Sequence, residues 1–166
     1  MNNSLSPYQL EHSDFSNEVV IVCPKCTSKA LVKGPGLYNE KVEELTYCVC
    51  IHCGYNQKYY QKEADFMRTS SNGKVFGHHM QLLGGEVDPF FHHPLWFMGP
   101  CLEGVIWAYN LEHLELIETF IAATNRSRNG LPYKNSSIAS RLPKWMSVAK
   151  NRRTVLKCIR ELKERK

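Results

Sequence analysis

The sequence predicts an α+β fold, in which a four-cysteine module of antiparallel hairpins packs on a small unit of short strands and about three helices. Three observations support this prediction. Two Cys-x-x-Cys pairs, Cys23–Cys26 and Cys50–Cys53, are separated by 23 residues. Short apolar runs typical of strands flank both pairs, and apolar residues recur at helical spacing in the C-terminal half of the chain.

The two cysteine pairs have the spacing of zinc ligands. Four thiolates so placed can close a tetrahedral site around one zinc ion, as in a zinc ribbon. Because four protein ligands leave no coordination position for water or substrate, the expected zinc is structural. Gly54 follows the second pair and permits the left-handed backbone that such a turn often needs. Thr27 occupies the equivalent position after the first pair, where a positive φ would bring strain.

Cys48 competes with Cys50 as the third ligand. Strand alternation places both side chains on the same face, a few ångströms from the expected ion. We favour Cys50, because a Cys48/Cys53 pair would have four intervening residues and no compact knuckle. Whether Cys48 can replace Cys50 is left open by the sequence. His52, between the ligands, is expected to be exposed at the tip of the knuckle.

The alternative is that these cysteines are buried or disulfide-bonded. The segment from Met1 to Ser6 is polar and lacks the apolar core of a signal peptide, which favours a reducing compartment and therefore zinc. No apolar run approaches the roughly 18 to 20 residues of a membrane-spanning helix. We therefore expect a soluble cytoplasmic protein with no membrane contact. Cys101 and Cys158 have no cysteine partner nearby in the sequence and are expected to be buried packing residues.

The expected domain plan has three parts: a mobile leader over residues 1–17, the zinc ribbon over residues 18–62, and an α+β or helical unit with a basic C-terminal region over residues 63–166. In the ribbon, Val19–Val22 and Ala30–Val32 are predicted strands around the first knuckle, followed by a turn at Gly34–Gly36. Residues 44–50 lead into the second knuckle and residues 55–60 lead out of it.

In the second unit, Val105–Tyr109 is a predicted strand after a turn at Gly99–Pro100. Asn110 is a predicted N-cap for a helix that extends to about Asn125. Residues 137–142 begin another helix that bends or restarts at Pro143. A last helix is predicted from residue 151 onward, with one apolar face formed by Val155, Ile159 and Leu162.

The net charge of +5 conceals a division along the chain. Residues 1–125 contain 8 Lys/Arg and 14 Asp/Glu, whereas residues 126–166 contain 13 Lys/Arg and 2 Asp/Glu, which gives −6 and +11. Such a basic region can neutralise phosphates, although it can also be an ordinary solvated helical surface. The candidate nucleic-acid-binding residues are Arg141, Lys144, Arg152, Arg153, Lys157 and Arg160.

A catalytic interpretation centres on His92, His93 and Asn110. Their order before an apolar helix resembles that of HNH nucleases, in which a His general base acts beside a divalent metal. The pattern is incomplete, because Thr119 stands where the closing metal ligand is expected and His113 comes too early. A structural role for these residues is the simpler interpretation, so we expect no catalytic residues.

The two knuckles, Cys23-Pro-Lys-Cys26 and Cys50-Ile-His-Cys53-Gly54, resemble zinc ribbons of the transcription factor IIB type. Together with Pro94-Leu95-Trp96, the run from Trp107 to Leu114 and the run from Ser140 to Met146, they are similar to a group of bacterial ribbon-containing proteins without an assigned function. The resemblance implies a bacterial cytoplasmic protein. It describes the ribbon and not an activity.

These observations favour a non-catalytic zinc-ribbon binding module. Its basic C-terminal region would contact DNA, RNA or a nucleic-acid-bound protein. The alternatives are a metal-dependent HNH-like nuclease and a pure protein-interaction adaptor. The sequence leaves open the partner, any base preference and the oligomeric state.

Overall fold

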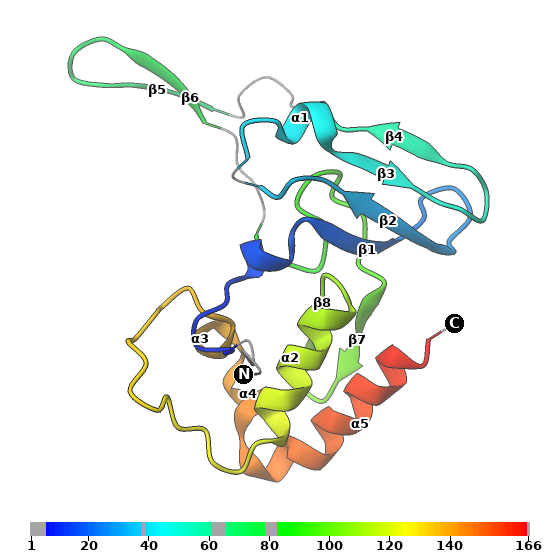
Figure 1. Cartoon of the computed structure of the whole chain (residues 1–166), viewed down its shortest axis with the longest axis vertical. Helices are drawn as coiled ribbons and strands as arrows, with labels where there is room; N and C mark the ends of the chain where they lie inside the picture. The colour runs from blue at the N-terminus through cyan, green and yellow to red at the C-terminus, as the bar shows by residue number, and fades with distance from the viewer. Residues whose placement is uncertain (1–5, 38, 61–65, 79–82, 166) are drawn as a thin grey trace, which may run out of the picture.

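The structure is a computed structural model, and it describes residues 6–37, 39–60, 66–78 and 83–165. It has an α+β architecture, with a four-stranded antiparallel sheet above a second layer of helices and a hairpin (Figure 1). The described strands are β1 (Glu18–Val22), β2 (Lys29–Lys33), β3 (Tyr47–Val49), β4 (Asn56–Lys58), β5 (Phe66–Thr69), β6 (Val75–His78), β7 (Phe97–Cys101) and β8 (Gly104–Ala108). The described helices are η1 (His12–Phe15), α1 (Val42–Leu45), α2 (Leu111–Ala122), α3 (Ile138–Arg141), α4 (Lys144–Ser147), η2 (Ala149–Asn151) and α5 (Arg152–Lys163).

The four-stranded sheet has the order β1-β2-β3-β4, and each strand pairs with the next in the chain. In its register Val20 lies opposite Leu31, and Leu31 lies opposite Val49. The turns β1–β2 and β3–β4 therefore lie at the same end of the sheet, which brings the two cysteine pairs together (Figure 1). The predicted strands around the first knuckle are confirmed. The short helix α1 was not predicted, and it precedes β3 within the segment that leads into the second knuckle.

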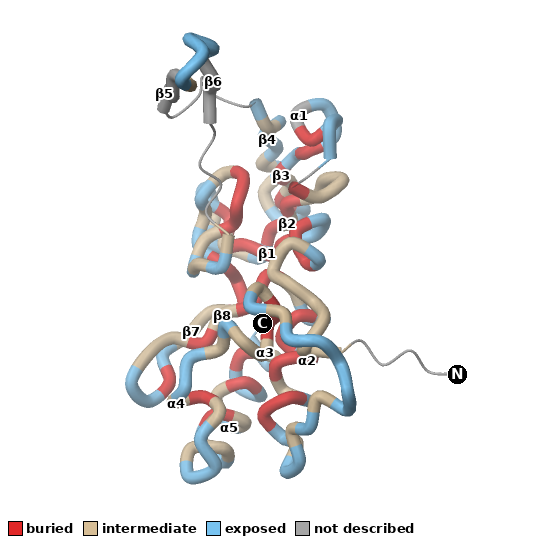
Figure 2. Tube along the Cα trace, turned by 90° about the vertical axis from the view of Figure 1, so that its left-hand side faces the viewer, coloured by how far each residue is buried: buried red, intermediate tan, exposed pale blue. Residues whose placement is uncertain are grey.

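The free edge of β1 joins the sheet to the rest of the protein. The amide of Val20 donates to the carbonyl of Tyr109 at 2.7 Å, and the amide of Trp96 donates to the carbonyl of Val20 at 2.9 Å. Ile21 also forms an isolated bridge with Leu95. These bonds satisfy backbone groups that an edge strand would otherwise expose. Figure 2 shows buried residues continuing from the sheet into the inner faces of the helices.

In the second layer, β7 and β8 form a hairpin beside α2 and α5 (Figure 1). The expected turn at Gly99–Pro100 is wrong, because both residues belong to β7 and the chain turns at Leu102, which has φ 52°. Pro is tolerated in an edge strand where no ladder donor is needed. Gly99 allows α5 to approach closely, since a Cβ there would lie 3.0 Å from Cδ2 of Leu162.

The predicted helices of this layer are confirmed. Asn110 caps α2, and its side chain accepts a hydrogen bond from the amide of His113 at 2.9 Å. Two short helices, α3 and α4, flank Pro143, where the sequence predicts a restart. The apolar face of α5 buries Val155, Ile159 and Leu162, as expected. None of the helices in the described part of the chain is long and apolar enough to cross a bilayer.

Residues 6–17 are packed on the body of the protein, where the sequence suggests a mobile leader. Phe15 is buried. The amide of Ile138 donates to the carbonyl of Leu10 at 2.8 Å, and the hydroxyl of Tyr8 donates to the carbonyl of Arg126 at 2.6 Å. This segment therefore connects α2, α3 and the loop between them. Residues 1–5 of the expected leader lie outside the described residues.

Candidate metal centre

The two knuckles have the same backbone geometry. In the first, the amide of Cys23 donates to the carbonyl of Ser28 at 2.8 Å, and the amide of Thr27 donates to the carbonyl of Cys23 at 3.0 Å. In the second, the equivalent bonds join Cys50 to Tyr55 at 2.8 Å and Gly54 to Cys50 at 3.0 Å. Each turn therefore holds its two cysteines with both sulfurs on one side.

The four knuckle sulfurs form one compact group. Sγ of Cys23 lies 3.7 Å from Sγ of Cys53, and Sγ of Cys26 lies 3.7 Å from Sγ of Cys50. All four lie within 4.8 Å of one another. A tetrahedral zinc site with Zn–S bonds of about 2.3 Å has sulfurs about 3.8 Å apart. The donor set and its spacing therefore fit a four-coordinate metal ion.

The first knuckle contains a strained residue. Thr27 has φ 60° and Gly54 has φ 70°, so both turns end in the left-handed conformation. Glycine adopts this conformation without penalty, whereas a β-branched residue does not. The sequence allows either a turn without a positive φ at Thr27 or a strained one, and the structure shows the strained turn.

Backbone amides around the sulfurs favour their thiolate forms. The amide of Lys25 donates to Sγ of Cys23 at 3.4 Å. Hydrogen bonds from the backbone and side chain of Ser28 lower the pKa of Cys26. The amide of Tyr55 has the same effect on Cys53, but burial and the three neighbouring thiols together raise the pKa of Cys53. Four thiols so close together cannot all ionise without a cation among them.

Cys48 is not part of the sulfur group. It lies inside the sheet, opposite Val32 on one side and Gln57 on the other, and its side chain is fully buried. Burial, aided by nearby Asp88, raises its pKa to about 12. Cys50 comes one residue after the end of β3, where its sulfur reaches the other three. His52 is exposed beside the knuckle, as expected.

His92 and His93 lie on a loop that Asp88 shapes, and Asn110 hydrogen-bonds to the backbone. Buried Asp88 accepts the amides of Phe90, Phe91 and His93 at 2.9, 2.8 and 2.6 Å, which shapes the loop that contains both histidines. His92 is exposed, and the ring of His93 stacks on that of Phe91 at 5.9 Å. Asn110 also donates to the carbonyl of Glu18 at 2.8 Å. Among the described residues, neither histidine belongs to a group of side chains close enough to share a metal ion.

The six candidate nucleic-acid-binding residues occupy three different settings. Arg153, Lys157 and Arg160 are exposed along α5, and Lys144 is exposed on α4. Arg141 is exposed on α3, beside a cavity described below. Arg152 is half-buried, and its Nη2 donates to the carbonyl of Ala123 at the end of α2. Arg152 is therefore not freely exposed, although the predicted nucleic-acid-binding surface requires it to be.

Other basic side chains of this region contact neighbouring groups of the fold. The guanidinium of Arg126 donates to the carbonyls of Phe120 and Ile121, both at 3.0 Å, and to that of Ser147. Lys163 pairs with Glu118 at 2.7 Å and also with Glu115. Arg165 lies over the ring of Trp96 at 4.6 Å. The basic composition of residues 126–166 thus overstates the charge that is free at the surface.

Cys101 is buried and Cys158 packs half-buried against the core, as expected, but the sequence does not predict that the two are paired. The structure joins them by a disulfide between β7 and α5, with a Cα–Cα distance of 6.2 Å. Their separation of 57 residues gives no local signal, because the pairing depends on how α5 packs on β7. Sequence reasoning also missed His12 and the buried His113, which lie side by side with ring centroids 5.5 Å apart.

No protein-family model, curated protein or solved structure gives a significant match to the chain. The bacterial origin and the transcription factor IIB type that the resemblance implies thus have no support from these comparisons. The fold and the site by themselves define an α+β protein with a four-cysteine cluster able to hold a metal ion.

Proposed function

We propose that this protein is a non-catalytic zinc-ribbon binding module that holds one structural zinc ion and contacts nucleic acid through the exposed basic face of α5. The proposed zinc site rests on the group of four sulfurs that lie within 4.8 Å of one another. Four thiolates prefer zinc among the common divalent ions, and they leave no position open for substrate. The metal therefore supports the fold and carries no reaction.

The second half is supported by the division of α5 into two faces. Val155, Ile159 and Leu162 are buried against the protein, while Arg153, Lys157 and Arg160 are exposed on the other side. Lys157 has an acidic neighbour in Glu161, at 3.7 Å, and both side chains are so exposed that the pair contributes little. Lys144 and Lys150 are also exposed and precede the same helix in the chain. We name these five residues the α5 basic face: Lys144, Lys150, Arg153, Lys157 and Arg160.

The metal half of the proposal is tested by counting zinc. Purified protein should contain about one zinc per chain, and Cys50→Ser or Cys53→Ser should release it and lower stability, because metal binding in such modules is coupled to folding. Cys48→Ser is the matched control, since Cys48 lies within the sheet and outside the sulfur group. Loss of zinc in Cys48→Ser with retention in Cys50→Ser would reverse the ligand assignment.

The nucleic-acid half is tested by fluorescence anisotropy with labelled single-stranded and duplex DNA and with RNA. If about four cations contact phosphates, the logarithm of affinity should fall against log salt with a slope of about −3 to −4. Reversal of Arg153, Lys157 and Arg160 to Glu should weaken binding and leave the zinc content unchanged. The control reverses Lys41, Lys58 and Lys74, three exposed lysines away from α5, and changes the net charge equally.

Three outcomes would contradict the proposed function. If both triple variants lose affinity equally, binding follows net charge and not the α5 basic face. If the native protein has no affinity for DNA or RNA at low salt, the basic face is better explained as a docking surface for an acidic protein. Cleavage of DNA or RNA with Mg²⁺ or Mn²⁺ that His93→Ala abolishes would overturn the non-catalytic assignment in favour of the HNH-like one.

A further inference from the structure

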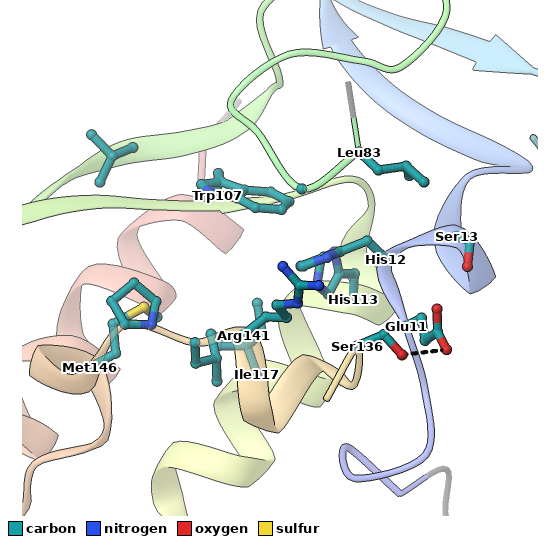
Figure 3. A pocket seen from close by; sticks show the side chains of 14 residues that line it. Glu11, His12, Ser13, Leu83, Trp107, His113, Ile117, Ser136, Arg141 and Met146 are labelled. Atoms are coloured by element: carbon teal, nitrogen blue, oxygen red, sulfur yellow. Dashed lines mark hydrogen bonds between the residues drawn. The ribbon is translucent and has the colours of Figure 1, made fainter. Parts of the chain in front are cut away.

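A cavity of about 470 Å³ is lined by residues of η1, β8, α2 and α3 (Figure 3). Figure 3 shows the side chain of Arg141 extending toward His12 and His113, with Trp107 lying above all three. The wall also contains apolar side chains, among them Val105, Ile117 and Met146. Sites for small molecules have this size and this mixture of apolar walls with a few convergent polar groups.

One cation at the cavity has no direct ion pair among the described residues. Glu11 is paired with Lys134 at 2.7 Å and accepts the hydroxyl of Ser136 at 2.8 Å, and these hydrogen bonds lower the pKa of Glu11. Glu11 is therefore already paired, and the charge of Arg141 also contributes to lowering its pKa without a direct contact. The guanidinium of Arg141 forms no hydrogen bond or ion pair with any described residue. A cation beside a partly enclosed cavity favours an anionic ligand.

The two histidines are held neutral. His113 is fully buried, and its ring stacks on Phe15 at a centroid distance of 4.6 Å. Its Nδ1 accepts the amide of Tyr109 at 3.3 Å, so the neutral ring has its proton on Nε2. That Nε2–H is buried and has no partner among the described residues. An unpaired buried donor beside the cavity is costly.

We propose that this cavity binds a small organic oxyanion, a carboxylate or a phosphate monoester, whose charged end pairs with Arg141 and whose apolar body lies against Trp107. His12 and His113 form the polar floor beside the anion. The cavity is far larger than the roughly 30 Å³ that a single water occupies, so the ligand needs a body as well as a charged end. This site is independent of the proposed zinc and nucleic-acid functions.

The protonation of His12 makes the binding of an anion at Arg141 depend on pH. Burial, and secondly the positive charge of Arg141, lower the pKa of His12 to about 4, while Glu11 raises it slightly. His113, the other titratable group beside it, is neutral over the same range because burial lowers its pKa to about 3. An anion on Arg141 removes the repulsion that His12 feels, so the pKa of His12 rises on binding. At pH values near the pKa of His12, ligand binding therefore takes up a proton, and affinity increases as the pH falls through that range.

The test is calorimetric titration of the full-length protein with two matched pairs of probes: phenyl phosphate against phenol, and benzoate against benzamide. We expect saturable binding of at least one anion and much weaker binding of its neutral partner. Arg141→Gln should weaken anion binding by about tenfold or more, because a charge-assisted hydrogen bond is lost. Lys41→Gln, an exposed cation that lies outside both the cavity and the α5 basic face, is the control and should bind the anion normally.

The His12 ring provides a second measurement. In NMR spectra of histidine-labelled protein, the saturating anion should shift the titration of His12 to higher pH, and Arg141→Gln should shift it upward without any ligand. Inorganic phosphate, which lacks an apolar body, should bind more weakly than phenyl phosphate. Equal binding of charged and neutral probes, an unchanged affinity in Arg141→Gln, or no saturable binding of either anion at millimolar concentrations would overturn the proposal.

Discussion

Asn110 should stabilise two parts of the fold at once, and its replacement measures both. Its Oδ1 caps α2 by accepting the amide of His113, and its Nδ2 donates to the carbonyl of Glu18 in β1. A lost N-cap costs about 1 kcal/mol, and the lost hydrogen bond to β1 costs about 1 kcal/mol more. The contact from Nδ2 to the carbonyl of Phe15, at 3.4 Å, is too long to add much. Asn110→Ala should therefore lower the free energy of unfolding by about 2 kcal/mol.

Asn110→Ser separates the two contributions. The serine hydroxyl can still cap α2 but is too short to reach β1, so we expect a loss of about 1 kcal/mol, half that of the alanine variant. Urea unfolding followed by far-UV circular dichroism, with zinc present, measures both values. The reasoning is refuted if Asn110→Ala unfolds within about 0.5 kcal/mol of wild type, or if both variants lose the same amount. The same variants, tested for Mg²⁺-dependent cleavage, also address the catalytic interpretation of Asn110.

Three further predictions concern other parts of the fold. Thr27→Gly should raise the free energy of unfolding by about 0.5 to 1 kcal/mol in urea, because it removes strain at φ 60°. Replacing Cys101 and Cys158 together by Ala should lower the free energy of unfolding by about 4 kcal/mol under non-reducing conditions, since the disulfide spans 57 residues. Adding a reductant to the wild-type protein should lower the free energy of unfolding by the same amount. If neither change has an effect, the disulfide is not formed. The pKa of buried His113 is lowered to about 3, so acid protonates the unfolded chain first and stability falls as the pH drops from about 6.5 toward 3. In His113→Gln, the slope of unfolding free energy against pH between about 6 and 4.5 should decrease by about 1.4 kcal/mol per pH unit, and an unchanged slope would show that His113 titrates normally.

The sequence was informative where structure depends on local pattern. The spacing of Cys23, Cys26, Cys50 and Cys53 was enough to nominate one site, because each knuckle is a short turn whose ligands are fixed by near neighbours. The start of α2 at Asn110 and the buried face of α5 follow from capping and helical periodicity in the same way.

What the sequence could not decide depends on which segments pack together. The Cys101–Cys158 pair, the strand β7 through Pro100, and the cavity between His12 and Arg141 each join segments that have no local signal for one another. The charge of the C-terminal region shows the same limit. Composition counts a half-buried arginine such as Arg152 and an exposed one as equal, but only tertiary packing determines which guanidinium is held by a carbonyl and which is free. The sequence by itself thus determined the candidate metal ligands and the main helices, whereas the tertiary structure decided which basic side chains are free and where a cavity forms.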